Sequence, residues 1–429
     1  MKRHETLPII PIARGEGVWL YDFDGHRYLD AVSSWWVNLF GHNESRIKAA
    51  IHQQLDRLEH VMLAGFTHQP VIELSERLAA LSGLGHAFYG SDGASAIEVA
   101  LKMSFHYWRN TGHPNKTRFV HLENSYHGET IGALAVTDIP LFRQTYAPLI
   151  LDGLVTPCPD NRQCTEDIDA ATLARQAAAQ LEYLLAERHH EIAALILEPL
   201  VQGAAGMAMY DPVYLQEARR LCDQYHIHLI ADEIAVGFGR TGTFFAHQQA
   251  EILPDLLCLS KGITGGYLPL SVVLCQDPIY HAFYDDEVSR GFLHSHSYTG
   301  NPLACSAALA TLDIFEHDHI IERNRTHAAT LNAEFEQLAA HPQVRHFRHL
   351  GMIWAFDVET ERLDFSLAFF QAMLKRECLV RPIGKTVYFM PPYIITREEV
   401  QHLVKATLES LDEVEHSPLQ KQRSDPAIA

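Results

Sequence analysis

Short apolar runs recur along the middle of the chain, and stretches with helical spacing separate them. The five clearest runs cover residues 118–122, 193–197, 228–231, 256–259 and 270–274. A short, mostly apolar run suits a strand that is buried on both faces. Strands that alternate with helices in this way pair in parallel between two helical layers. The pattern therefore predicts an α/β domain built around a mostly parallel sheet.

Helical spacing is clearest before and after these runs. Asn43 is a suitable N-cap for a first helix, because apolar residues follow it three or four positions apart. Those apolar residues are Ile47, Ile51, Leu55 and Leu58. A second helix is predicted over residues 70–81, and a long one over residues 304–316 and then 320–340.

The start of the chain predicts a small antiparallel hairpin. Residues 8–30 alternate apolar and polar positions around turn residues that lie between Gly15 and Gly25. Such a pattern is typical of an edge element with one buried face. The tail from Glu415 is polar and carries Pro, so we expect it to fray.

A second, smaller domain is expected because the pattern changes after about residue 310. The long helix there leads to short mixed segments at 351–358 and 387–390 instead of further apolar runs. We expect the N-terminal hairpin to join this section. The predicted division is a large domain over residues 33–317 and a small α+β domain made of residues 1–32 and 318–429.

Composition and charge narrow the function classes. The chain has 429 residues, of which 47% are hydrophobic, so an ordinary folded protein of two or three domains is expected. Its net charge of −19 argues against a nucleic-acid partner or an anionic membrane surface. No apolar run reaches about 18 residues, and no signal-peptide stretch follows Met1, so a cytoplasmic protein that does not enter the membrane is expected.

The cysteines and histidines do not indicate a metal site. The seven cysteines are scattered without a CxxC spacing, so reduced and mostly buried thiols are expected. Among the 27 histidines the pairs 189–190 and 294/296 stand out. No HExxH sequence occurs and no carboxylates group around these pairs, so hydrogen-bonding or solvated roles are favoured over metal binding.

Two residues at predicted strand ends suggest a cofactor. Asp232 follows the run 228–231, and Lys261 follows the run 256–259. A lysine amine at the mouth of a sheet can form a Schiff base with an aldehyde, and a carboxylate can keep a pyridine nitrogen protonated. Together they suit pyridoxal 5′-phosphate (PLP). Taken singly, each residue also fits a purely structural role, since Lys261 could be solvated and Asp232 could cap the next helix.

Two further segments could complete such a site. Residues 91–96 form a turn of small residues before a helical pattern, and this turn contains Gly93 and Ala94. A turn of this kind exposes N–H groups to a phosphate, although it also fits an ordinary helix start. Tyr126 and Gly128 lie in a loop after a strand, where the tyrosine could stack on a flat heterocycle or simply pack.

The ordered combination of motifs resembles a known family. Asp232 begins a Gly-rich loop that carries an arginine, and the chain resembles the class III aminotransferases of PLP fold type I over nearly its whole length. The segments that carry this likeness are Glu198-Pro199, 232–242, Lys261-Gly262 and Thr299-Gly300-Asn301-Pro302. Within the class it most resembles the adenosylmethionine:8-amino-7-oxononanoate aminotransferases of biotin biosynthesis, through residues 33–36, 65–68, 192–203 and 381–393.

The resemblance implies a role for each cofactor residue. Lys261 would be the catalytic residue, holding the aldimine of a ping-pong mechanism and then moving a proton as the free amine. Asp232 would pair with the pyridine nitrogen and Tyr126 would stack on the ring. Gly93 and Ala94 would donate N–H groups to the phosphate. The expected fold has a mostly parallel sheet of the seven-stranded type between helices.

The same likeness implies a homodimer with shared active sites. The segment before Gly-Asn-Pro, here His296 and Ser297, would complete the phosphate site of the neighbouring subunit, and Ser295 would contact substrate. An isolated monomer is therefore expected to be inactive.

The implied substrates are S-adenosyl-L-methionine as amino donor and 8-amino-7-oxononanoate as acceptor, giving 7,8-diaminononanoate. Trp35, Trp36 and Tyr126 would form the walls for the long keto acid, and Lys261 would also contact the substrate. At the far end, Arg381 would bind its carboxylate with help from Tyr388, and Arg240 would act as a second anchor or gate. Core packing remains the alternative for the tryptophans, and a structural salt bridge for Arg381.

Three features depart from the family pattern. Ala94 stands where the family often has Ser or Thr, so a phosphate contact is lost or passes to Ser95. The segment 294–297 is one form of a variable stretch, which leaves the role of Ser295 open. An aromatic segment that covers the donor site in the family would lie before the present Met1. Either the start is assigned too late or donor binding is altered.

Three alternative functions stay open. Another class III aminotransferase, with a 4-aminobutyrate, ornithine, diamine or lysine donor, would use the same lysine chemistry without the tandem tryptophan or Arg381. An aminomutase would turn over without a second substrate. A catalytically silent PLP-binding regulator is disfavoured, because Lys261 and Asp232 are intact and the chain carries no appended DNA-binding helix pair.

Overall fold

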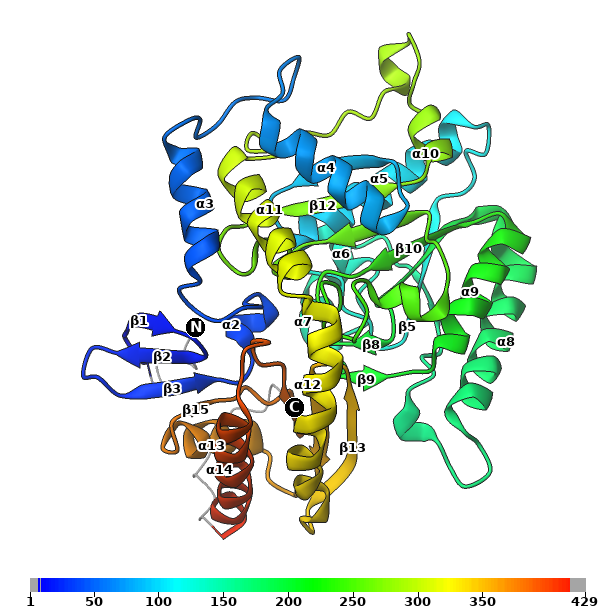
Figure 1. Cartoon of the computed structure of the whole chain (residues 1–429). Helices are drawn as coiled ribbons and strands as arrows, with labels where there is room; N and C mark the ends of the chain where they lie inside the picture. Colours follow the sequence, from blue (N-terminus) through cyan, green and yellow to red (C-terminus); the bar gives the residue numbers. More distant parts are fainter. Residues whose placement is uncertain (1–6, 8, 417–429) are drawn as a thin grey trace.

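The structure is a computed structural model that describes residue 7 and residues 9–416. Its centre is a seven-stranded sheet in the order β4-β12-β11-β10-β7-β5-β6 (Figure 1). Strand β12 runs antiparallel to both of its neighbours, and the remaining neighbours pair in parallel. The strands are β4 (His86–Gly90), β5 (Arg118–Leu122), β6 (Leu154–Thr156), β7 (Ile192–Leu197), β10 (His228–Asp232), β11 (Leu256–Leu259) and β12 (Ser271–Cys275). The mostly parallel sheet is thus confirmed, as are all five strands predicted within it.

Helices cover both faces of this sheet because alternate strand residues point in opposite directions. Leu256 and Cys258 of β11 pack in the core cluster that contains α5, whereas Leu257 and Leu259 pack with α4 and α11. Towards the β6 end of the sheet, α8 and α9 share a third cluster with β5 and β7. These helices are α4 (Gln69–Ser82), α5 (Gly93–Asn110), α8 (Ala170–Arg188), α9 (Pro212–Tyr225) and α11 (Pro302–His317).

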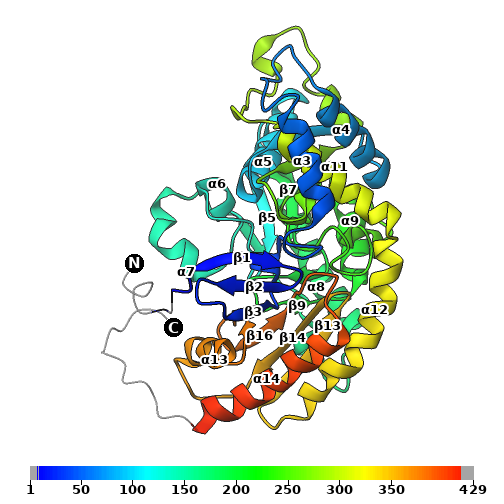
Figure 2. The same ribbon diagram turned by 60° about the vertical axis from the view of Figure 1, so that its left-hand side comes forward.

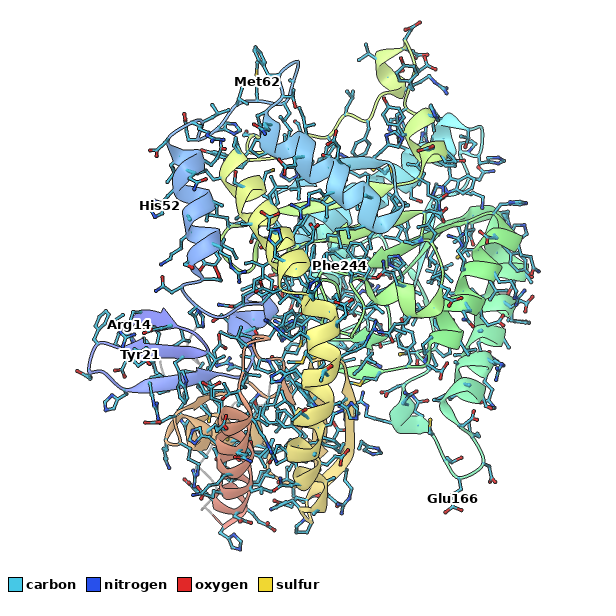
Figure 3. The ribbon with its side chains drawn as sticks, in the orientation of Figure 1. Arg14, Tyr21, His52, Met62, Glu166 and Phe244 are labelled. Carbon is cyan, nitrogen blue, oxygen red and sulfur yellow. The ribbon has the colours of Figure 1, made fainter. Side chains whose placement is uncertain are left out.

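Two small sheets lie in the other half of the molecule, as Figures 1 and 2 both show. The first contains the predicted N-terminal hairpin, in which β1 (Ile12–Glu16), β2 (Trp19–Asp22) and β3 (Arg27–Asp30) pair antiparallel and β15 (Cys378–Leu379) adds in parallel to β3. On this hairpin Arg14 lies over the ring of Tyr21, 3.6 Å from its centroid (Figure 3).

The second small sheet is antiparallel and has the order β13-β14-β16. Its strands are β13 (Val344–Leu350), β14 (Ile353–Val358) and β16 (Thr386–Phe389), and it lies with α12 (Ile320–Phe335), α13 (Phe365–Leu374) and α14 (Arg397–His416). Because β15 comes from the C-terminal part and pairs with the N-terminal hairpin, this topology supports the predicted grouping of residues 1–32 with 318–429. The domain boundaries themselves stay a prediction.

Several predicted helix ends were wrong. Helix α3 (Ser45–Leu55) is capped by Glu44, whose side chain accepts from the backbone N–H of Arg46, and it ends before Leu58. Asn43 was predicted as the cap, but its φ of 66° is left-handed, a conformation that an N-cap does not adopt. The helix predicted over 320–340 gives way to a 3₁₀ turn, Glu336–Ala340, after Phe335.

The predictions about the two ends of the chain can be compared with the structure only in part. Glu415 was predicted to begin a frayed tail, but it and His416 lie in α14. The remaining tail, and the expectation about the start at Met1, lie outside the described residues. No helix of the described part is long and apolar enough to cross a membrane. All seven cysteines are unpaired and six of them are buried, as predicted.

Candidate active site

Lys261 and Asp232 lie at the same edge of the large sheet. Strands β10 and β11 are parallel neighbours, and Asp232 at the end of β10 is in register with Cys258 of β11. Lys261 follows just beyond the end of β11 and begins the 3₁₀ turn η5 (Lys261–Thr264). Because the carboxyl ends of parallel strands meet at one edge, the amine and the carboxylate are brought to a common site.

A buried histidine holds the Asp232 carboxylate. The Nδ1 atom of His127 lies 2.7 Å from Asp232 Oδ2, and the backbone N–H of Ile234 donates to Oδ1. The His127 side chain is fully buried, and its Nε2 atom has no partner within the described residues. The sequence analysis gave His127 no role, although its place beside Tyr126 was a usable signal.

Glu198 is a second residue without a predicted role. Its buried carboxylate accepts from the backbone N–H groups of Tyr126 and Gly203, at 3.1 and 2.9 Å. Burial raises the pKa of Glu198 to about 7; His127 opposes this shift and Asp232 adds to it. The site therefore contains two buried carboxyl groups that interact with each other.

The amine of Lys261 is less basic than an ordinary lysine amine. Burial lowers the pKa of Lys261 to about 8, although Asp232 and Glu198 act in the opposite direction. Within the described residues its Nζ atom makes no hydrogen bond or ion pair, and it lies 4.3 Å from the centroid of the Trp36 ring. A larger unprotonated fraction near neutral pH makes such an amine a better nucleophile.

The turn before α5 has the features of a phosphate site. The helix starts at Gly93, and its cap Asp92 accepts from the N–H and the hydroxyl of Ser95. The preceding N–H groups, of Gly93 and Ala94, have no partner inside a helix. The Ser95 hydroxyl is engaged by Asp92, so the alternative that it takes over a phosphate contact is not supported. A side chain at Gly93 would press on Ile234, with a Cβ about 3.1 Å away.

Tyr126 lies in the loop after β5, where the chain passes close to this turn. A Cβ on Gly128 would lie 2.8 Å from the Ala94 methyl carbon, and Gly128 has a φ of 120°, so only glycine fits. The Tyr126 hydroxyl donates to Glu129 at 3.0 Å, and its ring meets Phe142 edge-on.

A line of side chains leads away from Lys261. The Trp36 indole N–H donates to the hydroxyl of Tyr388 at 3.1 Å, and the two rings meet edge-on. Burial raises the pKa of Tyr388 to about 12, and the nearby Arg381 charge opposes that shift. The Arg381 guanidinium lies 4.8 Å from the Phe370 ring centroid. The structure thus brings together amine, aromatic wall and distant cation.

Other predicted residues lie apart from this line. Trp35 is 63% exposed. Ser295 and Ser297 are exposed as well, and His296 contacts His294 through their Nε2 atoms, 2.9 Å apart. An exposed position is compatible with the predicted contribution to a neighbouring subunit, which stays a prediction.

Arg240 has a different setting from the one predicted. Its guanidinium is almost fully buried and donates to the backbone carbonyls of Asn38, Met390 and Pro391. These bonds leave its Nε atom without a partner within the described residues, so its role as a substrate anchor or gate stays a prediction. In the structure these three hydrogen bonds also join the loop of Arg240 to the segments at Asn38 and at Met390-Pro391.

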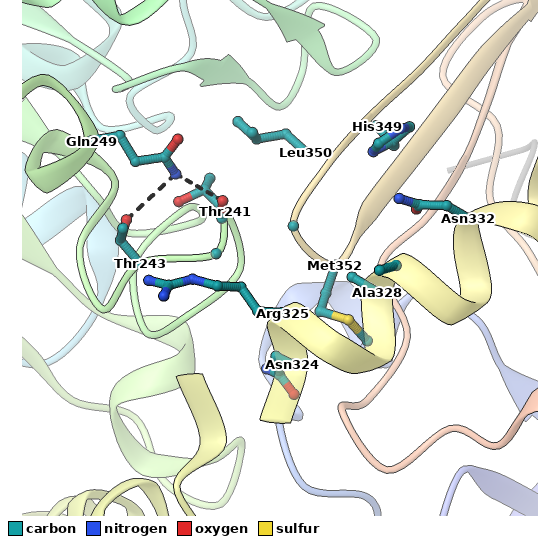
Figure 4. Close-up of a pocket in the computed structure, with 13 residues that line it drawn as sticks. Thr241, Thr243, Gln249, Asn324, Arg325, Ala328, Asn332, His349, Leu350 and Met352 are labelled. Carbon is teal, nitrogen blue, oxygen red and sulfur yellow. Dashed lines mark hydrogen bonds between the residues drawn. The ribbon is translucent and has the colours of Figure 1, made fainter. Parts of the chain in front are cut away.

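A separate cavity of about 410 Å³ lies away from this site (Figure 4). The loop 241–249, helix α12 and the turn between β13 and β14 form it, and Gln249 there donates to the Thr241 carbonyl. It contains none of the predicted site residues. Its lining has no lysine and no carboxylate, so it does not offer the chemistry found at Lys261.

The residues at the sheet edge fit PLP. A free amine at Lys261, a buried carboxylate at Asp232 and open N–H groups at Gly93 and Ala94 match its aldehyde, ring nitrogen and phosphate. Within the described residues no group of three or more His, Cys, Asp or Glu side chains could hold a metal ion.

Comparisons with known proteins agree with this geometry. The family described as aminotransferase class-III matches residues 1–411. The Helicobacter pylori adenosylmethionine-8-amino-7-oxononanoate aminotransferase is 49% identical over 96% of this chain and 94% of that protein. The protein of the same name from Anoxybacillus flavithermus is 39% identical over 96% of this chain and 93% of that protein.

Solved structures confirm the predicted fold. The Methanocaldococcus jannaschii adenosylmethionine-8-amino-7-oxononanoate aminotransferase has a TM-score of 0.89 and 34% identity, covering 96% of this chain and 95% of that one. A PLP-bound amine transaminase from an uncultivated Pseudomonas species has a TM-score of 0.90 and 34% identity, with 95% of each chain covered. The resemblance to PLP-dependent transferases of fold type I is thereby confirmed, and this chain belongs to the class-III aminotransferase family.

Proposed function

We propose that this protein transfers the amino group of S-adenosyl-L-methionine to 8-amino-7-oxononanoate with PLP as cofactor, giving 7,8-diaminononanoate in biotin biosynthesis. The observation that carries the proposal is the line from Lys261 through Trp36 and Tyr388 to Arg381. It offers a reactive amine, an apolar wall and a cation in the order that a long keto acid with a terminal carboxylate needs. The Helicobacter pylori and Anoxybacillus flavithermus relatives carry the name of this activity.

The cofactor would be held by Lys261, Asp232 and Tyr126 together with the N–H groups of Gly93 and Ala94. When bound, PLP supplies an electron sink for the carbon that loses a proton. Asp232 would keep a positive charge on the ring nitrogen, and His127, whose Nδ1 atom lies 2.7 Å from Oδ2, holds the orientation of that carboxylate. Because burial lowers its pKa to about 8, the Lys261 amine can both accept and return a proton near neutral pH.

The keto acid would lie along the aromatic wall. The Trp36 indole is 7% exposed and is fixed by its hydrogen bond to Tyr388, so it can exclude water from the reacting carbon. The Arg381 guanidinium, which makes no ion pair within the described part of the chain, can bind the terminal carboxylate through two parallel N–H groups.

A homodimer with shared active sites is part of the proposal. Large apolar side chains are exposed in the segments 62–66 and 293–298, including Met62 at 56% (Figure 3) and Leu293 at 71%. Exposed apolar side chains that gather in this way favour burial against another chain. His296 and Ser297 would reach the phosphate of the neighbouring site, and Ser295 its substrate. Unpaired cysteines support a reducing, cytoplasmic location.

A donor comparison tests the activity. Purified protein with PLP is mixed with 8-amino-7-oxononanoate and either S-adenosyl-L-methionine or lysine, and diaminononanoate is measured. We expect product with the first donor and little with the second. The reverse result would overturn the donor assignment, and conversion of 8-amino-7-oxononanoate to an isomer of the same composition without any donor would indicate an aminomutase. A Lys261→Ala variant serves as the inactive control.

A further inference from the structure

The segment that carries Trp36 has an unusual backbone. Helix α2 (Ser33–Trp36) is a left-handed turn, because its four residues Ser33, Ser34, Trp35 and Trp36 have φ values of 49°, 47°, 74° and 71°. Residues other than glycine disfavour this conformation, and four in a row require support from their surroundings. Such support must come from groups outside the turn.

Asp30 supplies much of that support. It is fully buried at the end of β3, and its Oδ1 atom accepts from the backbone N–H of Ser34 at 2.9 Å. Its Oδ2 atom accepts from the Ser34 hydroxyl at 2.7 Å and lies 3.0 Å from His42 Nε2. The Ser33 hydroxyl donates to Met390 O on the other side of the turn.

The hydrogen-bond pattern requires an acceptor at both oxygens of Asp30. The amide nitrogen of Asn38 lies 3.1 Å from His42 Nδ1, so Nδ1 accepts and Nε2 carries the proton that points at Asp30. The carboxylate therefore faces three donors: the Ser34 N–H, the Ser34 hydroxyl and the His42 ring. An amide in its place would turn an NH₂ group towards at least one of them.

The turn fixes the depth of the indole in the site. The front of the Trp36 ring faces the Lys261 amine at 4.3 Å. At the outer edge of the ring, a Cβ on Gly203 would lie only 2.9 Å from its Cη2 atom, and the adjoining space is an apolar void too small for water. Close packing at this edge and the hydrogen bond to Tyr388 restrict the ring, and the backbone of the turn sets where the side chain begins.

We propose that Asp30 is a positioning residue for the substrate, which acts by holding the left-handed turn and hence the Trp36 wall. The effect on the keto acid rests on the proposed function above. Asp30 makes no contact with the Lys261 amine, so its main influence on turnover is expected through the turn and Trp36; its charge also acts on Tyr388, the hydrogen-bond partner of Trp36.

Asp22 offers a matched control in the same small sheet. Its buried carboxylate also accepts several hydrogen bonds, from the backbone N–H groups of Asp24 and His26 and from the Tyr28 hydroxyl. It closes the β2–β3 turn and makes none of these contacts with the left-handed turn. Both Asp30→Asn and Asp22→Asn should therefore lower the free energy of unfolding. Only Asp30→Asn should also change the position of the Trp36 ring.

The kinetic test uses the PLP-loaded protein. Asp30→Asn is expected to raise the KM for 8-amino-7-oxononanoate about tenfold with a smaller change in kcat, the size expected for a lost hydrogen bond to a charged group. Asp22→Asn should change both constants less than about twofold. In a Trp36→Ala background, Asp30→Asn should add almost nothing, because the two residues act as one unit. Equal effects of the two aspartate variants, or an undiminished effect of Asp30→Asn without Trp36, would overturn the proposal.

A spectroscopic test does not depend on the substrate. The emission of Trp36 is obtained by subtracting the spectrum of Trp36→Phe, and it should shift with Asp30→Asn but not with Asp22→Asn. If no keto acid is turned over at all, the proposed function fails while this comparison still decides the role of Asp30. Should Asp30→Asn not fold, Ser34→Ala removes one of its three hydrogen bonds and should give the same changes at smaller size; an unchanged Trp36 emission and KM in that variant would contradict the proposal.

Discussion

The Nζ atom of Lys261 lies 4.3 Å from the centre of the Trp36 ring, and within the described residues it makes no hydrogen bond or ion pair. The amine that would react and the wall that would guide the substrate are therefore direct neighbours. The wall continues from Trp36 to Tyr388 and then towards Arg381. The residues that would bind the substrate therefore follow one another away from the reacting amine.

Replacement of Lys261 by alanine should remove the visible absorbance of the bound cofactor and lower turnover by at least about a thousandfold, because both attachment and proton transfer are lost. Reductive trapping with borohydride should label the peptide with Lys261. Lys116 is a suitable internal control, since burial lowers its pKa to about 8 as well while its amine donates to three backbone carbonyls. Label on Lys116 instead of Lys261 would contradict the assignment.

Loss of the His127 ring should weaken PLP binding by about ten- to hundredfold, because Asp232 loses a hydrogen bond to its charged carboxylate. The comparison is between wild type and His127→Phe, titrated with PLP and followed by absorbance. His247, whose Nδ1 atom holds buried Glu233 in the same way, gives a matched control in His247→Phe. Equal losses of affinity in the two variants would mean that His127 acts only on stability.

Lys261 should make the stability of the cofactor-free protein rise with pH. Its pKa is lowered to about 8 from an ordinary value of 10.5, so between these two values the unfolded chain binds a proton that the folded chain does not. Stability therefore increases from pH 8 to 10.5, by about 1 to 3 kcal/mol. Urea unfolding should show that Lys261→Met is more stable than wild type at pH 7 and that this advantage shrinks by pH 10. A pH-independent difference would refute the buried-amine account.

A side chain at Gly203 should disturb substrate binding through Trp36. The added Cβ would lie 2.9 Å from the indole and displace it from its present position beside Lys261. Gly203→Ala should raise the KM for the keto acid and cost about 1 to 3 kcal/mol of stability. Gly85→Ala is the control, because its Cβ would meet only the carboxylate end of Asp277 at an exposed site. If Gly203→Ala leaves the KM unchanged, the indole has more freedom than the packing indicates.

Local patterns predicted most of the large sheet, since buried parallel strands leave continuous apolar runs such as 256–259. Strand β6 is only three residues long, and β4 is partly exposed at the sheet edge, so neither produces such a run. The likeness to a family placed Lys261 and Asp232 in roles that the geometry supports. The buried setting of Arg240 could not be predicted from its neighbours in sequence, because its carbonyl partners lie far away at Asn38 and just after β16.

The roles of His127 and Glu198 were missed for a similar reason. Their significance arises from contacts with Asp232 and with the loop of Tyr126, which sequence spacing does not reveal. The left-handed turn at 33–36 is likewise fixed by Asp30 and Met390, and nothing in its four residues requires positive φ values.

The most direct measurement follows the amino nitrogen. S-adenosyl-L-methionine labelled with ¹⁵N at its amino group is incubated with the PLP-loaded protein and 8-amino-7-oxononanoate, and the diaminononanoate is analysed by mass spectrometry. The account predicts one ¹⁵N atom in each product molecule and no measurable product with Lys261→Ala. Diaminononanoate without the label, or labelled product only when ¹⁵N-lysine replaces the first donor, would contradict it.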